Sequence, residues 1–182
     1  MKRLSMFNFF KRNRLKVCKK YLDRFIQGID YRSLNAKERA GKKRHKYEML
    51  RDRYVHTNVT GYRISHKFFE LYKDGRLLIK CGYRWDGPSG VTFDTASFMR
   101  SSAVHDCIFQ MLRENMFMII VPKDQKMSDM VEWLVLFTLA NEELRRLAKI
   151  DGMMWPRYHW VYAAVQNFGK RHAQPKNIEL QK

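Results

Sequence analysis

The hydrophobic pattern of this chain changes from a strand period to a helical period near residue 96, and that change restricts the fold more than any other feature. Residues 54–84 are rich in β-branched and aromatic side chains, which favour strands, and Asp74-Gly75 within them is typical of a hairpin turn. From residue 96 onward the apolar residues recur at helical spacing. This order predicts an α+β fold, in which a small antiparallel β-sheet or hairpin is followed by a three-helix bundle.

Three helices are expected in the second half of the chain. The first covers about 97–114 and is capped by Asp94 or Thr95, the second covers about 125–149, and the third begins at Pro156 and ends at Phe168 before Gly169. One face of each is apolar and is expected to pack in the core. These faces comprise Phe98, Ser102, His105, Phe109 and Leu112, then Val131, Leu134, Val135, Leu139 and Leu147, then Tyr158, Val161, Tyr162 and Val165.

The charge is unevenly distributed along the 182 residues, whose formal net charge is +18. Residues 1–53 hold 18 Lys and Arg against 5 Asp and Glu (18 − 5 = +13), whereas residues 54–182 hold 18 against 13 (18 − 13 = +5). We therefore divide the chain into a basic N-terminal arm over 1–53, a globular domain over 54–170 and an irregular tail over 171–182.

Within the arm, residues 13–28 have the pattern of a short cationic amphipathic helix, and residues 35–53 are expected to form a polar helix or a flexible tether. Such an arm favours an anionic partner, which is nucleic acid, an acidic protein or anionic lipid, although a solvated tail is the alternative. The residues expected to contact that partner are Lys11, Arg12, Arg14, Lys16, Lys19, Lys20, Lys42, Lys43 and Arg44.

Several protein classes are disfavoured by what the sequence lacks. No stretch reaches 18 uninterrupted apolar residues, so no transmembrane segment is expected, and the N-terminus has no pattern of a secretory signal. The three cysteines, Cys18, Cys81 and Cys107, are widely spaced, which disfavours a disulfide scaffold and a cysteine zinc site. Synthesis in a reducing cytoplasm fits this cysteine content.

The segments WDGPSG (85–90) and VHDCIF (104–109) contain the candidate site. His105 and Asp106 are neighbours on a helix, so their side chains diverge by about 100°, the imidazole facing inward and the carboxylate facing the preceding loop. Asp129, at the start of the second helix, is the expected partner of His105. The alternative is structural: His105 and Asp129 satisfy each other in the core, and WDGPSG is only a turn.

The stretches GYRWDGPSG, FMRSSAVHDCIFQMLREN, SDMVEWLVLFTLA and YHWVYAAVQNFG, within residues 60–170, together resemble a phage and prophage family, domain of unknown function 1353. The same pattern is similar, more weakly, to the two-helix core of phospholipases A2. That resemblance implies that His105 is a general base and that Asp129 orients it. It also implies a calcium ion bound by Asp106 and by the carbonyl groups of Gly87 and Gly90.

Three functions follow from the sequence and stay open at this point. The first is a structural or accessory protein of a bacteriophage virion, made in the host cytoplasm and placed among tail, neck or capsid proteins by its basic arm. The second is a calcium-dependent hydrolase of phospholipid-type esters that aids entry or lysis. The third is a non-specific nucleic-acid binder, whose affinity would fall steeply with salt.

Overall fold

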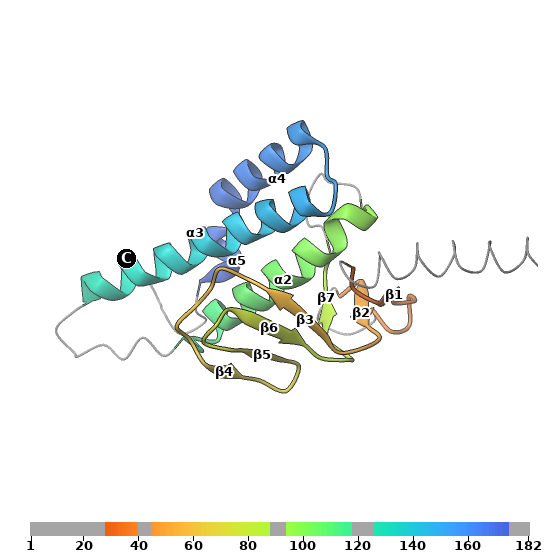
Figure 1. Cartoon of the computed structure of the whole chain (residues 1–182), viewed down its shortest axis with the longest axis horizontal. Helices are drawn as coiled ribbons and strands as arrows, with labels where there is room; N and C mark the ends of the chain where they lie inside the picture. Colours follow the sequence, from red (N-terminus) through yellow and green to blue (C-terminus); the bar gives the residue numbers. More distant parts are fainter. Residues whose placement is uncertain (1–27, 40–44, 88–93, 118–125, 175–182) are drawn as a thin grey trace, which may run out of the picture.

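The computed structural model describes residues 28–39, 45–87, 94–117 and 126–174, with the side chains of its longest helix described from Glu132 onward. These residues form two antiparallel sheets and four helices (Figure 1). The predicted α+β class, with strands first and a three-helix arrangement after them, is confirmed. None of the described helices is long and apolar enough to cross a membrane.

The first sheet, sheet A, has the strand order β1-β2-β7, formed by β1 (Tyr31–Ser33), β2 (Tyr47–Met49) and β7 (Arg84–Trp85). The sequence suggested a polar helix or tether over 35–53, and the structure instead has β2 there. The reason is the alternation of Tyr47 and Met49, both buried, which gives β2 one apolar face. Folded structure therefore begins well before residue 54.

Some of the charged side chains between residues 28 and 53 pair with one another. Arg53 lies 2.6 Å from the carboxylate of Asp30, and Arg32 forms ion pairs with Glu38 at 2.7 Å and with Glu48. This part of the expected arm is therefore held in the fold. The remaining excess charge is concentrated in residues 1–27, with 9 Lys and Arg against 1 Asp (9 − 1 = +8), which lie outside the described residues.

The second sheet, sheet B, has the order β3-β6-β5-β4, formed by β3 (Arg53–His56), β4 (Ile64–Ser65), β5 (Phe69–Leu71) and β6 (Arg76–Ile79). The hairpin predicted at Asp74-Gly75 joins β5 to β6. Gly75 has a φ of +83°, and the Asp74 carboxylate accepts a hydrogen bond from the backbone N–H of Arg76 at 3.1 Å. The left-handed backbone conformation of Gly75 and the hydrogen bond accepted by the Asp74 side chain are both typical of a tight turn.

Helix α2 (Ala96–Arg113) is the centre of the molecule. It contacts sheet B on one side and helices α3 and α5 on others, so that twelve of its 18 residues are buried. All five residues of the predicted apolar face are among them. Thr95 is the N-cap by position but makes no capping hydrogen bond, and Asp94 instead accepts one from the Tyr47 hydroxyl, which joins sheet A to the start of α2.

Helices α3 (Lys126–Ile150), α4 (Trp155–Phe168) and α5 (Lys170–Ala173) complete the fold. The bounds of α3 and α4 agree closely with expectation, whereas α5 lies partly in the expected irregular tail, with Ala173 fully buried. The predicted core face of α3 is partly wrong, because Leu134 and Val135 are exposed and the helix buries Leu136, Phe137, Ala140 and Leu144 instead. Val131 lies outside the residues whose side chains are described.

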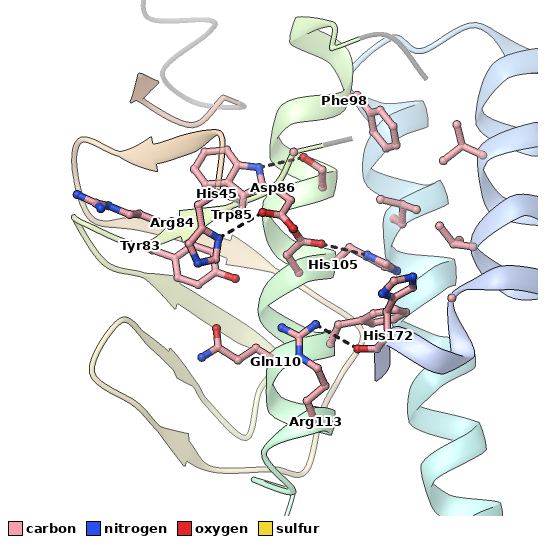
Figure 2. A pocket seen from close by; sticks show the side chains of 18 of the residues that line it. His45, Tyr83, Arg84, Trp85, Asp86, Phe98, His105, Gln110, Arg113 and His172 are labelled. Atoms are coloured by element: carbon pink, nitrogen blue, oxygen red, sulfur yellow. Dashed lines mark hydrogen bonds and ion pairs between the residues drawn. The ribbon is translucent and has the colours of Figure 1, made fainter. Parts of the chain in front are cut away.

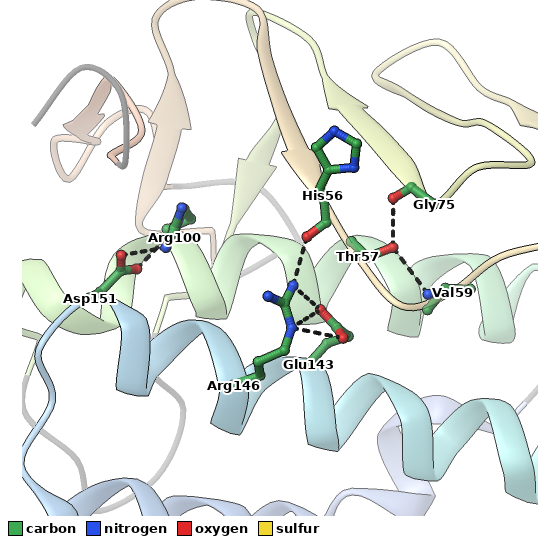
Figure 3. Close-up of polar contacts among 8 residues, drawn as sticks. All are labelled: His56, Thr57, Val59, Gly75, Arg100, Glu143, Arg146 and Asp151. Carbon is green, nitrogen blue, oxygen red and sulfur yellow. Dashed lines mark hydrogen bonds and ion pairs between the residues drawn. The ribbon is translucent and has the colours of Figure 1, made fainter.

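Helix α3 is tied to sheet B by a buried ion pair (Figure 3). Glu143 is 1% exposed and is bound by Arg146, whose guanidinium lies 2.7 Å from the carboxylate and also donates to the backbone carbonyl of His56 at 2.7 Å. A buried carboxylate needs such a partner, because an unpaired charge in the interior is costly. The pair therefore fixes where α3 crosses the sheet.

Replacement of Gly75 by Ala should destabilise the fold more than the same change at Gly61. Both glycines have a φ near +85°, but a Cβ at Gly75 would lie 2.3 Å from the Thr57 carbonyl oxygen, whereas nothing lies within 4 Å at Gly61. We expect Gly61→Ala to cost about 1 kcal/mol through backbone strain alone and Gly75→Ala to cost clearly more. Urea unfolding of the two variants measures the difference, and equal midpoints would contradict the turn geometry.

Candidate functional site

A pocket of about 220 Å³ lies where the segment after β7 meets helices α2, α4 and α5 (Figure 2). Its polar lining includes two histidine–aspartate pairs and two arginines, Arg84 and Arg113. Its apolar lining comes from all three long helices. The apolar side chains are Phe98 and Phe109 of α2, Leu144 of α3, and Val161, Ala164 and Val165 of α4.

His105 of α2 is buried in the wall of this pocket, with 7% of its surface exposed. Its Nε2 lies 2.8 Å from the side-chain oxygen of Asn141 on α3, which is fully buried. The Asn141 amide nitrogen donates to Gln166 of α4 at 2.8 Å, and Gln166 in turn donates to the Tyr162 hydroxyl at 3.0 Å. Because the Asn141 oxygen is an acceptor, Nε2 of His105 carries the hydrogen, and Nδ1 of the neutral ring is an acceptor.

The Nδ1 atom of His105 lies 3.6 Å from a carboxylate oxygen of Asp106, whose side chain is 27% exposed (Figure 2). The two side chains were expected to diverge, because they are neighbours on a helix. Their Cβ atoms do point in different directions, but the imidazole and the carboxylate extend toward each other at their ends. The ring of Phe109 packs on the imidazole with centroids 3.9 Å apart. A base held this way can accept a proton at Nδ1 and have its positive charge balanced by Asp106.

The second pair, His45 and Asp86, lines the same pocket from the sheet A side. His45 Nδ1 lies 3.4 Å from an Asp86 carboxylate oxygen, and neither of these two buried atoms has a hydrogen bond within the described residues. The indole of Trp85 donates to the Ser102 hydroxyl at 3.2 Å and so fixes the segment to α2. Gly87 has a φ of +72° and packs on the Tyr47 ring, where an added Cβ would lie 2.4 Å from a ring carbon.

Positive side chains stand beside these pairs. The Arg113 guanidinium donates to the backbone carbonyl of His172 at 3.1 Å, and Arg84 lies 3.2 Å from the carboxylate of Glu48. Arg84, with a side chain 43% exposed, can also reach an anionic group of a ligand. A pocket with a neutral imidazole acceptor and guanidinium groups is suited to a substrate that carries or develops negative charge.

Cys107, the residue after Asp106, is not a nucleophile of this site. Its side chain is fully buried on α2, and burial raises the pKa of its thiol. Because the thiolate is the reactive form, a buried cysteine whose pKa is raised stays protonated and inert.

Three of the residues singled out from the sequence, His105, Asp106 and Gly87, line this one pocket. Asp129 does not take the expected place: Asn141 occupies Nε2 of His105, and Asp129 stands 12 positions earlier on α3, about 18 Å along the helix axis. The side chain of Asp129 and all of Gly90 lie outside the described residues. So do all nine residues of the expected basic partner surface, from Lys11 to Arg44.

Local sequence patterns did not mark Asn141, His45 and Asp86 as site residues. Asn141 had a signal, since an amide within an apolar helical stretch must find a partner in the core. His45 lies in a run of charged residues with no local pattern to mark it, and Asp86 was taken as part of a turn. Only the pairing of β2 with β7 brings His45 and Asp86 together.

The described residues offer few ligands for calcium. Calcium prefers six to eight oxygen ligands, with several carboxylates among them. Asp106 and Gly87 line the pocket, but no group of three ligand side chains that could hold a metal ion exists within the described part of the chain. Calcium therefore stays a prediction from the resemblance, and no step proposed below uses it.

The geometry predicts that neutral His105 exists as the Nε2–H tautomer. Long-range ¹H–¹⁵N NMR spectra of the ¹⁵N-histidine-labelled protein above pH 8 measure this directly, with the His105→Gln variant assigning the signal. We expect Nε2–H in the wild type and a loss of this preference in Asn141→Leu, which removes the acceptor. A wild-type ring protonated at Nδ1 instead would mean that Asn141 donates to it, and the base would then not face Asp106.

Comparison with known proteins does not identify a family for this chain. No protein-family model, curated protein or solved structure matches the chain. The function proposed below therefore rests on the pocket itself and on the sequence resemblance described above.

Proposed function

We propose that the pocket is a hydrolytic site in which His105 acts as the general base that activates water against an ester. The observation that carries the proposal is the fixed imidazole: Nε2 is bound by Asn141 in the interior, and Nδ1 is an acceptor beside Asp106 at the pocket. A positioned histidine with a ring nitrogen available for a proton is the commonest general base in enzymes.

The reaction requires one proton to move twice. Nδ1 of His105 takes a proton from water as the water oxygen attacks the carbonyl carbon, and the imidazolium then gives that proton to the departing alkoxide. Asp106 offsets the positive charge of the imidazolium between these steps, a task that the neutral Asn141 amide does not perform. Arg113 and Arg84, at the pocket wall, can stabilise negative charge on the substrate.

The size of the pocket limits how much of a substrate it encloses. A volume of about 220 Å³ corresponds to about seven water molecules, which suits the reacting ester and its immediate neighbours but not a whole lipid. The resemblance to phospholipases A2 supports a phospholipid-type ester, with the acyl chains left outside the pocket. Hydrolysis assisted by calcium is the form of this proposal that the resemblance favours.

Substitution of His105 should remove the activity. We expect His105→Gln to lower kcat/KM on a short-chain phospholipid ester by about 10²- to 10⁴-fold, because the base is lost, and Asp106→Asn to lower it by a smaller factor. His159→Gln is the matched control, since His159 is exposed on α4 and does not line the pocket. Assays with added calcium and with chelator test the cation.

Two results would contradict the hydrolytic proposal. One is wild-type protein that hydrolyses no ester under either condition. The other is His105→Gln protein, folded as judged by circular dichroism, that remains as active as the wild type.

We also propose that the chain is an accessory protein of a bacteriophage virion, held there by its basic N-terminal residues. The charge distribution supports this location, because residues 1–27 carry a net charge of +8. An arm of that charge fits acidic surfaces of tail, neck or capsid proteins, or packaged DNA. The resemblance to a phage and prophage family supports the same assignment.

The location is tested by mass spectrometry of purified virions. We expect the chain to be found in particles that have been banded on a density gradient, and a variant with Lys11, Arg12, Arg14, Lys16, Lys19 and Lys20 changed to Gln to be depleted from them. Particles that lack the wild-type chain altogether would contradict a virion role without bearing on hydrolysis.

A further inference from the structure

The outer face of sheet B, which points away from α2, is an open surface of unusual composition. We define it by the outward residues of its strands and their immediate extensions: Tyr54 and His56, Arg63 and Ser65, Glu70 and Tyr72, and Arg76, Leu78 and Lys80. Figure 1 shows the described helices α2, α3 and α4 on the other side of this sheet. The alternate residues, including Val55, Phe69, Leu71, Leu77 and Ile79, are buried against that side.

Two tyrosines lie next to each other on the outer face. The rings of Tyr54 and Tyr72 have centroids 6.3 Å apart and are tilted by 47°, and Tyr54 is 60% exposed although it stands in a sheet. The Tyr72 hydroxyl donates to Glu70 at 2.8 Å, which raises the pKa of Tyr72 to about 12. Tyr72 is therefore a neutral ring at physiological pH and does not repel an anion.

Arginine side chains lie over these rings. The guanidinium carbon of Arg63 is 4.5 Å from the centre of the Tyr72 ring, and that of Arg76 is 5.1 Å from it. Arg63 is exposed and forms no ion pair with any described residue, whereas Arg76 is paired with Asp74 at 2.6 Å. The geometry holds planar cations beside aromatic planes.

The outer face also carries excess positive charge. Arg63, Arg76 and Lys80, with Lys67 and Lys73 in the adjoining turns, oppose Glu70 and Asp74 (5 − 2 = +3). Its only aliphatic side chain is Leu78, which is 8% exposed, so the face lacks the apolar surface that insertion into a lipid layer would need. The ligand that complements this face best is an extended polyanion that exposes flat aromatic groups.

We propose that the outer face of sheet B binds single-stranded nucleic acid. Bases stack on the Tyr54 ring and on the guanidinium planes of Arg63 and Arg76, while the lysines neutralise phosphates. A duplex is disfavoured because its bases are already stacked and do not offer their faces. This site does not depend on the proposed hydrolysis, and it differs from the basic N-terminal segment expected from the sequence.

Fluorescence anisotropy with a labelled twelve-nucleotide oligo(dT) tests the site. We expect Tyr54→Ala to weaken binding about 5- to 100-fold and Tyr54→Phe to restore it, since stacking needs the ring and not the hydroxyl. Arg63→Ala should also weaken binding, because a stacking plane is lost, whereas Lys73→Ala should reduce the slope of log K against log salt by about 0.7, the value for one lost phosphate contact on a single strand. Thermal unfolding of each variant verifies that it is folded.

Matched controls separate this face from the rest of the chain. Trp160→Ala removes an exposed aromatic ring from α4, and Arg171→Ala removes an exposed arginine from α5, so both should bind like the wild type. All variants are repeated in the background in which Lys11, Arg12, Arg14, Lys16, Lys19 and Lys20 are Gln. The proposal predicts that the effects of Tyr54→Ala and Arg63→Ala persist in that background.

Several outcomes would overturn the proposal. These are an absence of oligo(dT) binding at low salt, equal affinity for a twelve-base-pair duplex or for heparin, and folded Tyr54→Ala and Arg63→Ala variants that bind like the wild type. Binding that disappears with the six N-terminal substitutions and is insensitive to Tyr54 would assign it to the basic segment instead.

Discussion

The burial of helix α2 on most of its sides is the constraint from which the rest of the structure follows. A helix in that position has almost no solvent to satisfy its polar side chains, so each must find a partner inside the protein. Ser101 and Ser102 donate to carbonyls one turn back, Arg100 forms a two-point ion pair with Asp151 at 2.6 and 3.0 Å, and His105 is bound by Asn141. These contacts determine how α3 and α4 lie on α2.

The pocket is a consequence of the same arrangement. Its apolar wall consists of the helix faces that pack around α2, and its polar wall consists of side chains that the sheet A segment brings to the exposed side of His105. The chain His105–Asn141–Gln166–Tyr162 crosses three helices and leaves one imidazole nitrogen toward the pocket. A purely structural histidine needs only its interior bond, whereas this one also stands beside the carboxylate of Asp106 at the pocket.

Positive charge is used in different ways along the chain. Between residues 28 and 53, Arg53 is paired with Asp30, and Arg32 is paired with Glu38 and Glu48, so that these cations stabilise the fold. On the outer face of sheet B, Arg63 and Arg76 lie beside the ring of Tyr72. The net charge of +18 therefore includes two groups of cations: some stabilise the fold, and others are available to a partner.

Local patterns in the sequence were enough to predict the α+β class, the Asp74-Gly75 hairpin and the bounds of α2, α3 and α4, because period and turn chemistry are properties of neighbouring residues. They also marked His105 and Asp106. Strands of three residues, such as β2, carry too little pattern to be recognised, and β2 exists because β1 and the distant β7 pair with it on its two sides. The partner of His105 likewise depended on where α3 crosses α2, which selected Asn141, 12 positions beyond Asp129. The sequence by itself determined which residues form helices and where His105 stands on its helix, whereas only the tertiary structure decided what this histidine contacts, since contacts between distant segments are set by packing and not by local periodicity.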